Sequence, residues 1–573
     1  MKITRLAPLS ALITATFASQ AAVYEIVELP VNQQANYVYG AAINNDGKAA
    51  VLLQEQFRPA IDVSRLNLES TTLQENIDVD AVAAGNISDD DMVYLYGYLQ
   101  NLGSTDSPSV TSQRFAYYSA AIADESGFDV VAGLDMFVPE LNALSRSATV
   151  RVRDVADNGW VVGDSTAPLE LLPYVNESDE TVNYQVRDYG LRAFVNIDDQ
   201  QIELLPEFTE LGGVSAAYGL NNSRQVAGFS SIGFDLRDVY GALNASIYVS
   251  CNNDETRGDI PVEACMASLQ KLSNFKNNAT RWTLDEALQV IESKTYAALT
   301  TVEEFIAETG YDGDESNIRI SSIAYGINDS GVMVGEASNI YTGPKIKGVT
   351  TDLTTSAAMF VNDEVVDISN PAEFYNSKAL GINNTGLVYG VGAKYVNGKN
   401  ASKLFIYDTT NESSVIVDGF FKSSSMNPRD MNESGQIVGE AEIDATFSAG
   451  STRRKHAFLY DYNDGSFVDL NDLIACDSGY ELVQADGIND HGEIVVTALK
   501  KREVKNIAGV VRTNTDGTAV ESETPVVLKL APIAGGQIQD CGTDESKQQR
   551  QGGVFGWLLL LAGLSVGLRR KFL

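Results

Sequence analysis

The chain has 573 residues, of which 44% are hydrophobic, so it has enough apolar material for a large folded body and is not an intrinsically disordered chain. Acidic residues outnumber basic ones, 77 Asp and Glu against 41 Lys and Arg, and the formal net charge is -36. This charge argues against nucleic acids and anionic membrane surfaces as partners, because both would repel the protein.

The first residues predict a secretory signal peptide over 1–21. Two basic residues precede an apolar run over 6–18, and small residues follow at Ala21 and Ala22. This order is typical of a segment that signal peptidase removes, and the apolar run is too short to span a membrane stably. We expect cleavage after Ala21 or Ala22.

The body of the chain, residues 22–534, repeats one short pattern: an apolar residue, Asn, a polar pair, Gly and an apolar strand. Asn tolerates a left-handed backbone and Gly supplies positive φ, so each copy predicts a hairpin turn. We count eight candidate copies, including a worn one at 87–93. The predicted turn positions are Asn44, Gly47, Asn158, Gly159, Asn221, Asn328, Gly331, Asn383, Gly386, Asn432, Gly435, Asn489 and Gly492.

A second pattern lies between the turns and consists of a small residue and an aromatic residue in an alternating apolar strand. The aromatic residues of this pattern are Phe194, Trp282, Phe360, Phe405 and Phe458. Periodic aromatics of this kind usually pack in a core. About four short strands in each repeat predict an all-β fold, a β-propeller of about seven to eight blades, with an array of β-sandwich units as the alternative.

The longest gap between turns predicts a small helical, cysteine-containing insertion at about 236–320. The four cysteines of the chain are Cys251, Cys265, Cys476 and Cys541. An even number in an exported chain predicts disulfides, and three pairings are possible. Proximity in the sequence favours Cys251 with Cys265 and Cys476 with Cys541.

One segment is rich in oxygen ligands and is a candidate calcium site, formed by Asp461, Asn463, Asp464 and Asp469. It falls one residue short of the calcium-loop spacing, and a hairpin turn explains it equally well. We predict no other cofactor. The chain has only 2 histidines, which disfavours a His-rich zinc site or a His-dependent catalytic triad.

The C-terminal end predicts a sorting segment. A polar linker is expected over 535–551, and the segment 552–573 begins with Gly552 and Gly553. A short apolar block follows and ends in a basic cluster at 569–571. Basic residues after an apolar block stay in the cytoplasm, which predicts a transient anchor in the inner membrane with the body outside.

This segment resembles the GlyGly-CTERM sorting signals. The resemblance implies that a rhombosortase-type protease cuts near Gly552 and Gly553, and that the body reaches the surface through the type II secretion machinery. The His-Ala-Phe strand at 456–458, together with the Asn-x-x-Gly turns, resembles HAF-type extracellular repeats. The chain as a whole resembles the uncharacterised proteobacterial domain of unknown function 3466 family, which implies an extracellular repeat protein and no catalytic motif.

The sequence therefore predicts an exported protein at the outer cell surface or in the medium. We expect a non-enzymatic binding or adhesion scaffold for an extracellular glycan or protein ligand. The alternative is a secreted hydrolase that acts on extracellular polymers with paired carboxylates drawn from different blades. Two carboxyl groups in one cleft, one with a raised pKa, would favour the hydrolase.

Overall fold

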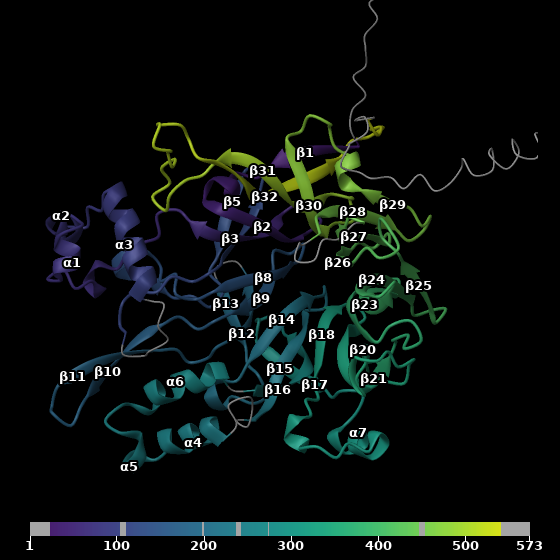
Figure 1. The fold of residues 1–573 in the computed structure, drawn as a ribbon, viewed down its shortest axis with the longest axis horizontal. Helices are drawn as coiled ribbons and strands as arrows, with labels where there is room; N and C mark the ends of the chain where they lie inside the picture. The colour runs from purple at the N-terminus through teal and green to yellow at the C-terminus, as the bar shows by residue number, and fades with distance from the viewer. Residues whose placement is uncertain are drawn as a thin grey trace, which may run out of the picture.

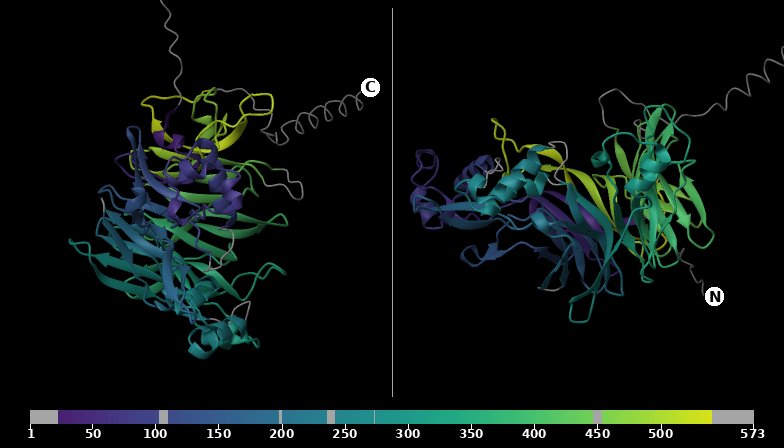
Figure 2. Two further views of the ribbon diagram at one scale, coloured as in Figure 1. Left: turned by 90° about the vertical axis from the view of Figure 1, so that its left-hand side faces the viewer. Right: turned by 90° about the horizontal axis from the view of Figure 1, so that it is seen from below.

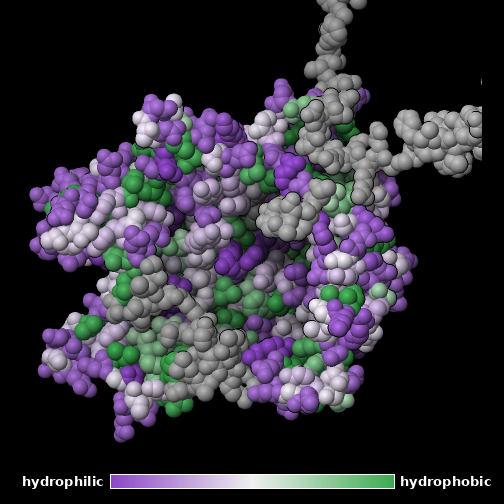
Figure 3. All heavy atoms as spheres, viewed as in Figure 1, coloured by the Kyte–Doolittle hydropathy of each residue, from purple (hydrophilic) through white to green (hydrophobic). Residues whose placement is uncertain are grey.

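A computed structural model describes residues 23–102, 110–197, 200–235, 242–272, 274–445 and 453–539. In this part of the chain, seven four-stranded antiparallel sheets stand around one axis as the blades of a propeller (Figure 1). The predicted β-propeller is confirmed, with seven blades. Hydrophilic residues dominate the face in Figure 3.

Each blade runs outward from an inner strand, which is named first here. Blade 1 consists of β2 (Ala35–Ile43), β3 (Ala49–Gln56), β4 (Ser119–Asp124) and β5 (Gly127–Val131). Blade 2 consists of β8 (Val150–Val155), β9 (Val161–Ser165), β12 (Arg192–Ile197) and β13 (Gln200–Leu204). Blade 3 consists of β14 (Ser215–Leu220), β15 (Gln225–Asp235), β16 (Asn274–Leu284) and β17 (Val290–Tyr296). Blade 4 consists of β18 (Ser322–Ile327), β19 (Met333–Ile340), β20 (Leu353–Val361) and β21 (Glu364–Asp367). Blade 5 consists of β22 (Asn376–Ile382), β23 (Leu387–Val396), β24 (Lys399–Asp408) and β25 (Ser413–Val417). Blade 6 consists of β26 (Met426–Met431), β27 (Gln436–Glu442), β28 (Lys455–Asp461) and β29 (Phe467–Asp469). Blade 7 consists of β30 (Tyr480–Ile488), β31 (Ile494–Glu503), β32 (Glu521–Pro532) and β1 (Tyr24–Glu28).

The two ends of the described chain meet in blade 7. Strand β1 pairs antiparallel with β32, so that Tyr24 lies opposite Pro532 and Glu28 opposite Leu528. The first strand of the chain is therefore the outer strand of the last blade. This arrangement closes the ring, because β30 of blade 7 also contacts β2 of blade 1.

The periodic aromatics form the cores of the blades, as predicted. Phe194, Trp282 and Phe458 are fully buried. Each lies beside a glycine of the second strand, and a Cβ atom at Gly439 would come within 3.0 Å of the Phe458 ring. The glycine of the repeat thus leaves the space that the aromatic ring of the third strand occupies.

Three insertions extend from the connections between second and third strands, and the views show them on the same side of the ring (Figure 1, Figure 2). The first lies between β3 and β4 and contains α1 (Thr71–Gln74), α2 (Val79–Ala83) and α3 (Asp89–Leu102). The prediction of a worn repeat at 87–93 was wrong, because these residues begin α3. The Ser88 hydroxyl accepts the N–H of Asp91 and donates to its carboxylate, which is a capping pair at a helix start.

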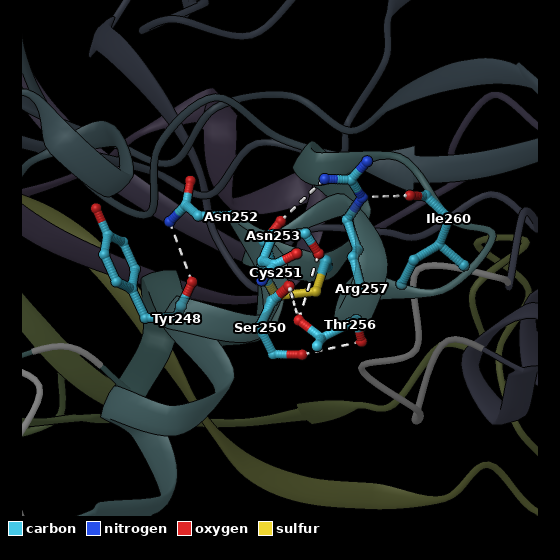
Figure 4. Close-up of a disulfide and its surroundings, with 9 residues drawn as sticks. Tyr248, Ser250, Cys251, Asn252, Asn253, Thr256, Arg257 and Ile260 are labelled. Carbon is cyan, nitrogen blue, oxygen red and sulfur yellow. Dashed lines mark hydrogen bonds between the residues drawn. A yellow bond between two sulfur atoms is a disulfide. The ribbon is translucent and has the colours of Figure 1, made fainter.

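The second insertion lies between β15 and β16 and contains α4 (Ala242–Cys251), α5 (Asp254–Arg257) and α6 (Val262–Leu272). A disulfide joins Cys251 to Cys265 and ties α4 to α6 (Figure 4). The Arg257 guanidinium donates to the carbonyl oxygens of Cys251 at 3.1 Å and Ile260 at 2.9 Å. The predicted helical, cysteine-containing insertion is therefore present.

The range predicted for that insertion, 236–320, is divided in the structure. It holds β16 and β17, which are strands of blade 3, and the separate helix α7 (Val302–Thr309) before blade 4.

A third insertion, the hairpin β10 (Glu170–Val175) and β11 (Thr181–Val186), contacts the second, since Tyr174 donates to Asp259 at 3.1 Å. A short hairpin, β6 (Phe137–Val138) and β7 (Ala143–Leu144), links blades 1 and 2.

Several sequence predictions fall on the ends of the chain. Ala21, Ala22, Gly552 and Gly553 lie outside the described residues, and so does Cys541. Cys476 is disulfide-bonded. Among the described residues, no helix is long and apolar enough to cross a membrane.

Candidate functional site in the central channel

The turn after each inner strand is built around a buried asparagine in six of the seven blades. These residues are Asn44, Asn221, Asn328, Asn383, Asn432 and Asn489. At Asn489, the side-chain oxygen accepts the N–H groups of His491 at 3.1 Å and Glu493 at 2.9 Å. Gly492 completes the turn with φ at 75°. The repeated Asn therefore fixes its own hairpin, because its side chain replaces a backbone acceptor.

Five of these six asparagines also join neighbouring blades, whereas the Nδ2 group of Asn383 has no hydrogen-bond partner among the described residues. The Nδ2 group of Asn432 donates to the carbonyl oxygen of Asn489 at 3.1 Å, and that of Asn221 donates to the carbonyl of Asn328 at 2.8 Å. Asn44 donates to the carbonyl of Ala156 at 3.1 Å. Each of these bonds connects equivalent turns of adjacent blades. This contact between blades explains why Asn recurs at the same position of the hairpin pattern.

Blade 2 departs from this pattern. Ala156 holds the position of the buried asparagine, and Asn158 lies two residues further along. The Asn158 side chain accepts only the N–H of Trp160, at 3.0 Å, and the residue is exposed. Asn158 and Gly159 thus form the predicted turn, but Asn158 does not contribute to the contact between blades.

The residue after each turn asparagine, or after Ala156 in blade 2, belongs to a second circle, which we call the turn ring: Asn45, Asp157, Asn222, Asp329, Asn384, Glu433 and Asp490. Amides and carboxylates nearly alternate around it. The N–H of Asp490 donates to the Asn45 side chain at 2.9 Å, and the N–H of Asn45 donates to Asp157 at 2.7 Å. Backbone N–H groups thus hold the side chains of the turn ring in place.

The turn ring surrounds a cavity of about 250 Å³ at one end of the channel. The residues that precede the turn asparagines, and Ala156 in blade 2, also border the cavity, while their side chains pack in the hydrophobic cores of the blades: Ile43, Val155, Leu220, Ile327, Ile382, Met431 and Ile488. Asp154 and Asp430 lie one residue deeper, and we call them the floor carboxyls. The described lining contains six carboxyl groups and no Lys, Arg or His. The lining of the cavity is therefore polar and acidic.

The floor carboxyls occupy equivalent positions in blades 2 and 6, which stand across the channel from each other. Asp430 accepts the N–H groups of Met431 and Ile488, both at 2.8 Å. Asp154 accepts those of Val155 at 2.8 Å and Leu220 at 3.1 Å. Each carboxyl group therefore bridges to the inner strand of the next blade.

Four other blades have glycine at the position of the floor carboxyls. A Cβ atom at Gly487 would lie 3.0 Å from the backbone nitrogen of Ile43, and one at Gly326 would lie 2.8 Å from Gly381. The inner strands therefore approach one another closely at this level. The channel is narrow there, and the floor carboxyls border its closed end.

The environment of the floor carboxyls disfavours their charged forms. Burial, and then the negative charges of Asp154 and Asp490, raise the pKa of Asp430 to about 7. Burial also raises the pKa of Asp154. In the turn ring, burial and the charges of Asp490 and Asp329 raise the pKa of Glu433. Burial and repulsion between neighbouring carboxylates thus favour the neutral forms of these three carboxyl groups.

Deeper in the channel, the charged groups neutralise one another. Arg429 contacts Glu440 at 2.8 Å and Asp486 at 3.9 Å, and Arg153 contacts Asp164 at 2.9 Å. A β-bulge occurs at this level in all seven inner strands, one example being between Pro428 and Asp430. Bulges redirect side chains, and here they bring the arginines beside their acidic partners.

The candidate calcium residues are not brought together. Asp461 accepts the N–H of Asn463 at 2.9 Å and Asp464 accepts that of Ser466 at 2.8 Å, as in a hairpin turn. Asp469 instead contacts His456 at 2.7 Å. In the part of the chain that the structure describes, no group of three or more Asp, Glu, His or Cys residues could hold a metal ion.

Sequence reasoning identified the turns but missed the cavity. Asp154 and Asp430 were not singled out, nor was the turn ring. The signal was present in the position after each turn asparagine, where aligned copies carry only Asn, Asp or Glu.

Three solved structures are similar to this chain at low sequence identity. The acylaminoacyl peptidase of Pyrococcus horikoshii shares 10% identity with a TM-score of 0.34, over 81% of this chain and 50% of that chain, so this chain spans about half its length. The β-propeller domain of the trilobed protease from Pyrococcus furiosus, described as having an open velcro topology, shares 10% identity with a TM-score of 0.34, over 85% and 97%. TolB from Acinetobacter baumannii shares 10% identity with a TM-score of 0.25, over 69% and 81%. These likenesses carry no argument about function.

A search of curated proteins gives no match. A family model, described as "Protein of unknown function (DUF3466)", matches residues 1–571. The chain therefore belongs to the DUF3466 family, as its repeats suggested.

Proposed function

We propose that this protein is an exported, non-enzymatic binding protein whose ligand site is the cavity inside the turn ring. One observation carries the proposal: all seven blades contribute to a cavity of about 250 Å³ whose described lining has six carboxyl groups and no basic side chain. A concave site of one charge sign concentrates ions of the opposite sign. The ligand that fits is a small organic cation.

A binding measurement tests this directly. Isothermal titration calorimetry would compare n-butylammonium with n-butanol, which has a similar shape and no charge. We expect only the ammonium ion to bind, and we expect Asp490→Asn to weaken its binding. Asp464→Asn is the matched control, because that carboxylate lies in the exposed β28–β29 turn. Equal binding of the alcohol, or equal loss in both variants, would contradict the proposal.

The export part of the proposal is supported by the two terminal signals and by the acidic composition. Mass spectrometry of both termini, on protein from washed cells and from medium, tests it. We expect a start at Ala22 or Val23 and an end near Gly552 or Gly553. An intact C-terminus at Leu573 in the inner-membrane fraction would show that the sorting segment is an ordinary anchor. A glycan or protein ligand for the outer surface stays a prediction.

A second candidate function is hydrolysis by paired carboxyl groups. Asp154 and Asp430 line one cavity and both have raised pKa values, which favours one of them as a proton donor at neutral pH. Assays of reducing-end release from soluble polysaccharides would test this with wild type, Asp430→Asn and Asp464→Asn. Release that only Asp430→Asn abolishes would favour hydrolysis, and no release in wild type would contradict it.

A further inference from the structure

We propose that the end of the channel opposite the turn ring binds an acidic glycan through its carboxylate groups and sugar rings. The proposed site is a row of basic and aromatic side chains that we call the arc: Tyr118, Arg151, Arg153, Tyr218, Tyr325 and Lys378. The arc shares no residue with the turn ring or the floor carboxyls. The inference therefore goes beyond the proposed function and stands independently of it.

The arc lies on the inner strands, beyond the floor carboxyls as seen from the turn ring. Arg153, Tyr218 and Tyr325 are the extra residues of the β-bulges in β8, β14 and β18, which stand side by side (Figure 1). The Arg153 guanidinium lies 5.3 Å from the centre of the Tyr218 ring, and the Tyr218 and Tyr325 rings are 5.1 Å apart. Lys378 of β22 follows, with Nζ 5.3 Å from the Tyr325 ring. Four adjacent blades therefore place these side chains in one continuous row.

Aromatic side chains extend the row toward blade 1. The N–H of Val150, the residue before Arg151, donates to the carbonyl oxygen of Tyr118 at 3.2 Å. The Tyr118 ring lies 4.5 Å from the ring of Tyr117, which is 62% exposed. The row thus reaches an exposed surface and is long enough for several linked sugar rings.

The arc is basic, although the chain as a whole is acidic. Arg151 and Arg153 share one carboxylate, that of Asp164, at 3.2 and 2.9 Å. Glu336 accepts the Tyr325 hydroxyl at 3.0 Å. With Lys378, three basic groups thus stand against two carboxyl groups. Exposed charges more than about 8 Å away are largely screened at physiological ionic strength, so the acidic remainder of the surface does not cancel this local excess.

The two arginines retain the capacity to bind an anion. The side chain of Asp164 is 2% exposed, whereas those of Arg151 and Arg153 are 39% and 34% exposed. A ligand therefore reaches the guanidinium groups but not the carboxylate between them. A guanidinium has five N–H donors and can bind a carboxylate with two of them, so each arginine can hold Asp164 and a ligand together.

Blade 6 shows the opposite arrangement on the other side of the channel. There a single guanidinium, that of Arg429, lies between two carboxyl groups, with Glu440 at 2.8 Å and Asp486 at 3.9 Å. The positive charge of Arg429 is therefore already balanced. This contrast favours blades 2 to 5 as the side that binds an anion.

The tyrosines favour a glycan over other acidic ligands. Tyr218 and Tyr325 are half-buried, and each offers an apolar ring and a polar hydroxyl. These match the C–H surface and the hydroxyl groups of a sugar ring, as a few polar groups on an apolar wall do in other ligand sites. A small inorganic anion would use only the arginines, and an acidic peptide has no rigid ring to lie along the tyrosines.

Calorimetry with the wild-type protein tests the inference. The probes are the hexasaccharides of galacturonate, mannuronate and guluronate, each with its carboxyl-reduced form, and hexaglutamate. We expect at least one uronate hexasaccharide to bind, at least tenfold more tightly than its carboxyl-reduced form and than hexaglutamate. No binding of any uronate, or equal binding of the carboxyl-reduced form, would overturn the inference. Equal binding of hexaglutamate would overturn it in favour of an acidic peptide.

Two matched variants locate the ligand. Arg151→Gln should weaken hexasaccharide binding at least tenfold, and Asp164 keeps Arg153 as its partner, so the variant should fold. Arg224→Gln is the control, because the Arg224 side chain is also 39% exposed and pairs with an acidic residue, but lies in the β14–β15 turn. It should bind as wild type does. Equal affinities of the two variants, with circular dichroism showing that both are folded, would overturn the assignment of the arc.

Discussion

The side-chain amide of Asn489 donates a hydrogen bond of 3.0 Å to the carbonyl oxygen of Asn44, across the junction between the last blade and the first. The two residues are 445 positions apart in the sequence. The same junction is closed at the rim, where β1 pairs with β32. The ring is thus closed both at its centre and at its edge.

The first prediction concerns this contact. Asn489→Ala removes the bond to Asn44 and leaves two turn N–H groups without their acceptor. We expect the free energy of unfolding to fall by about 1–3 kcal/mol, measured by urea denaturation, because buried donors lose their partner. Asn158→Ala is the control and should cost less, since Asn158 is exposed and accepts one N–H group. A larger loss at Asn158 would contradict the role assigned to the buried asparagines.

The second prediction concerns the second-strand glycines. A Cβ atom at Gly335 would collide with the carbonyl oxygen of Ile323 on the inner strand of the same blade. We expect Gly335→Ala to lower the thermal midpoint strongly or to prevent folding. Gly97→Ala provides the contrast, because Gly97 is exposed on α3 with open space around it, and alanine there should stabilise by up to about 1 kcal/mol. A harmless change at Gly335 would refute the packing described.

The third prediction concerns the disulfide between Cys251 and Cys265. It closes a loop with a sequence separation of 14, for which loop entropy gives about 3 kcal/mol. Replacing both cysteines by serine should increase hydrogen exchange in residues 242–272 and leave exchange in blades 5 and 6 unchanged. Faster exchange throughout the propeller would show that the insertion supports the whole fold.

The fourth prediction concerns pH. Burial and neighbouring charges raise the pKa of Asp430 to about 7, above its value in an unfolded chain. The folded state therefore holds a proton that the unfolded state has released, so this contribution to stability is lost as pH rises through about 7. Urea unfolding between pH 5.5 and 8 should show a shallower pH dependence for Asp430→Asn than for wild type. Identical pH dependence would show that Asp430 titrates normally.

The local parts of the fold could be predicted from the sequence. Asn489 and Gly492 belong to one four-residue pattern that predicts a hairpin turn. The aromatic residue Phe458 indicates the third strand of its blade. The first insertion could not be predicted, because the acidic run at 89–91 resembles a polar turn unless the cap by Ser88 is recognised. The cavity could not be predicted either, because Asp154 and Asp430 become neighbours only when the ring closes.

The pairing of β1 with β32 has a consequence for the order of events during synthesis. Residues 24–28 are made early, yet their partners at 528–532 are made about five hundred residues later. Until they meet, β32 presents an unpaired edge that invites association with other chains. If the chain crosses a membrane unfolded, β1 and β32 can pair only after both ends of the chain have reached the same side of that membrane. Completion of blade 7 is therefore a late event in the folding of this protein.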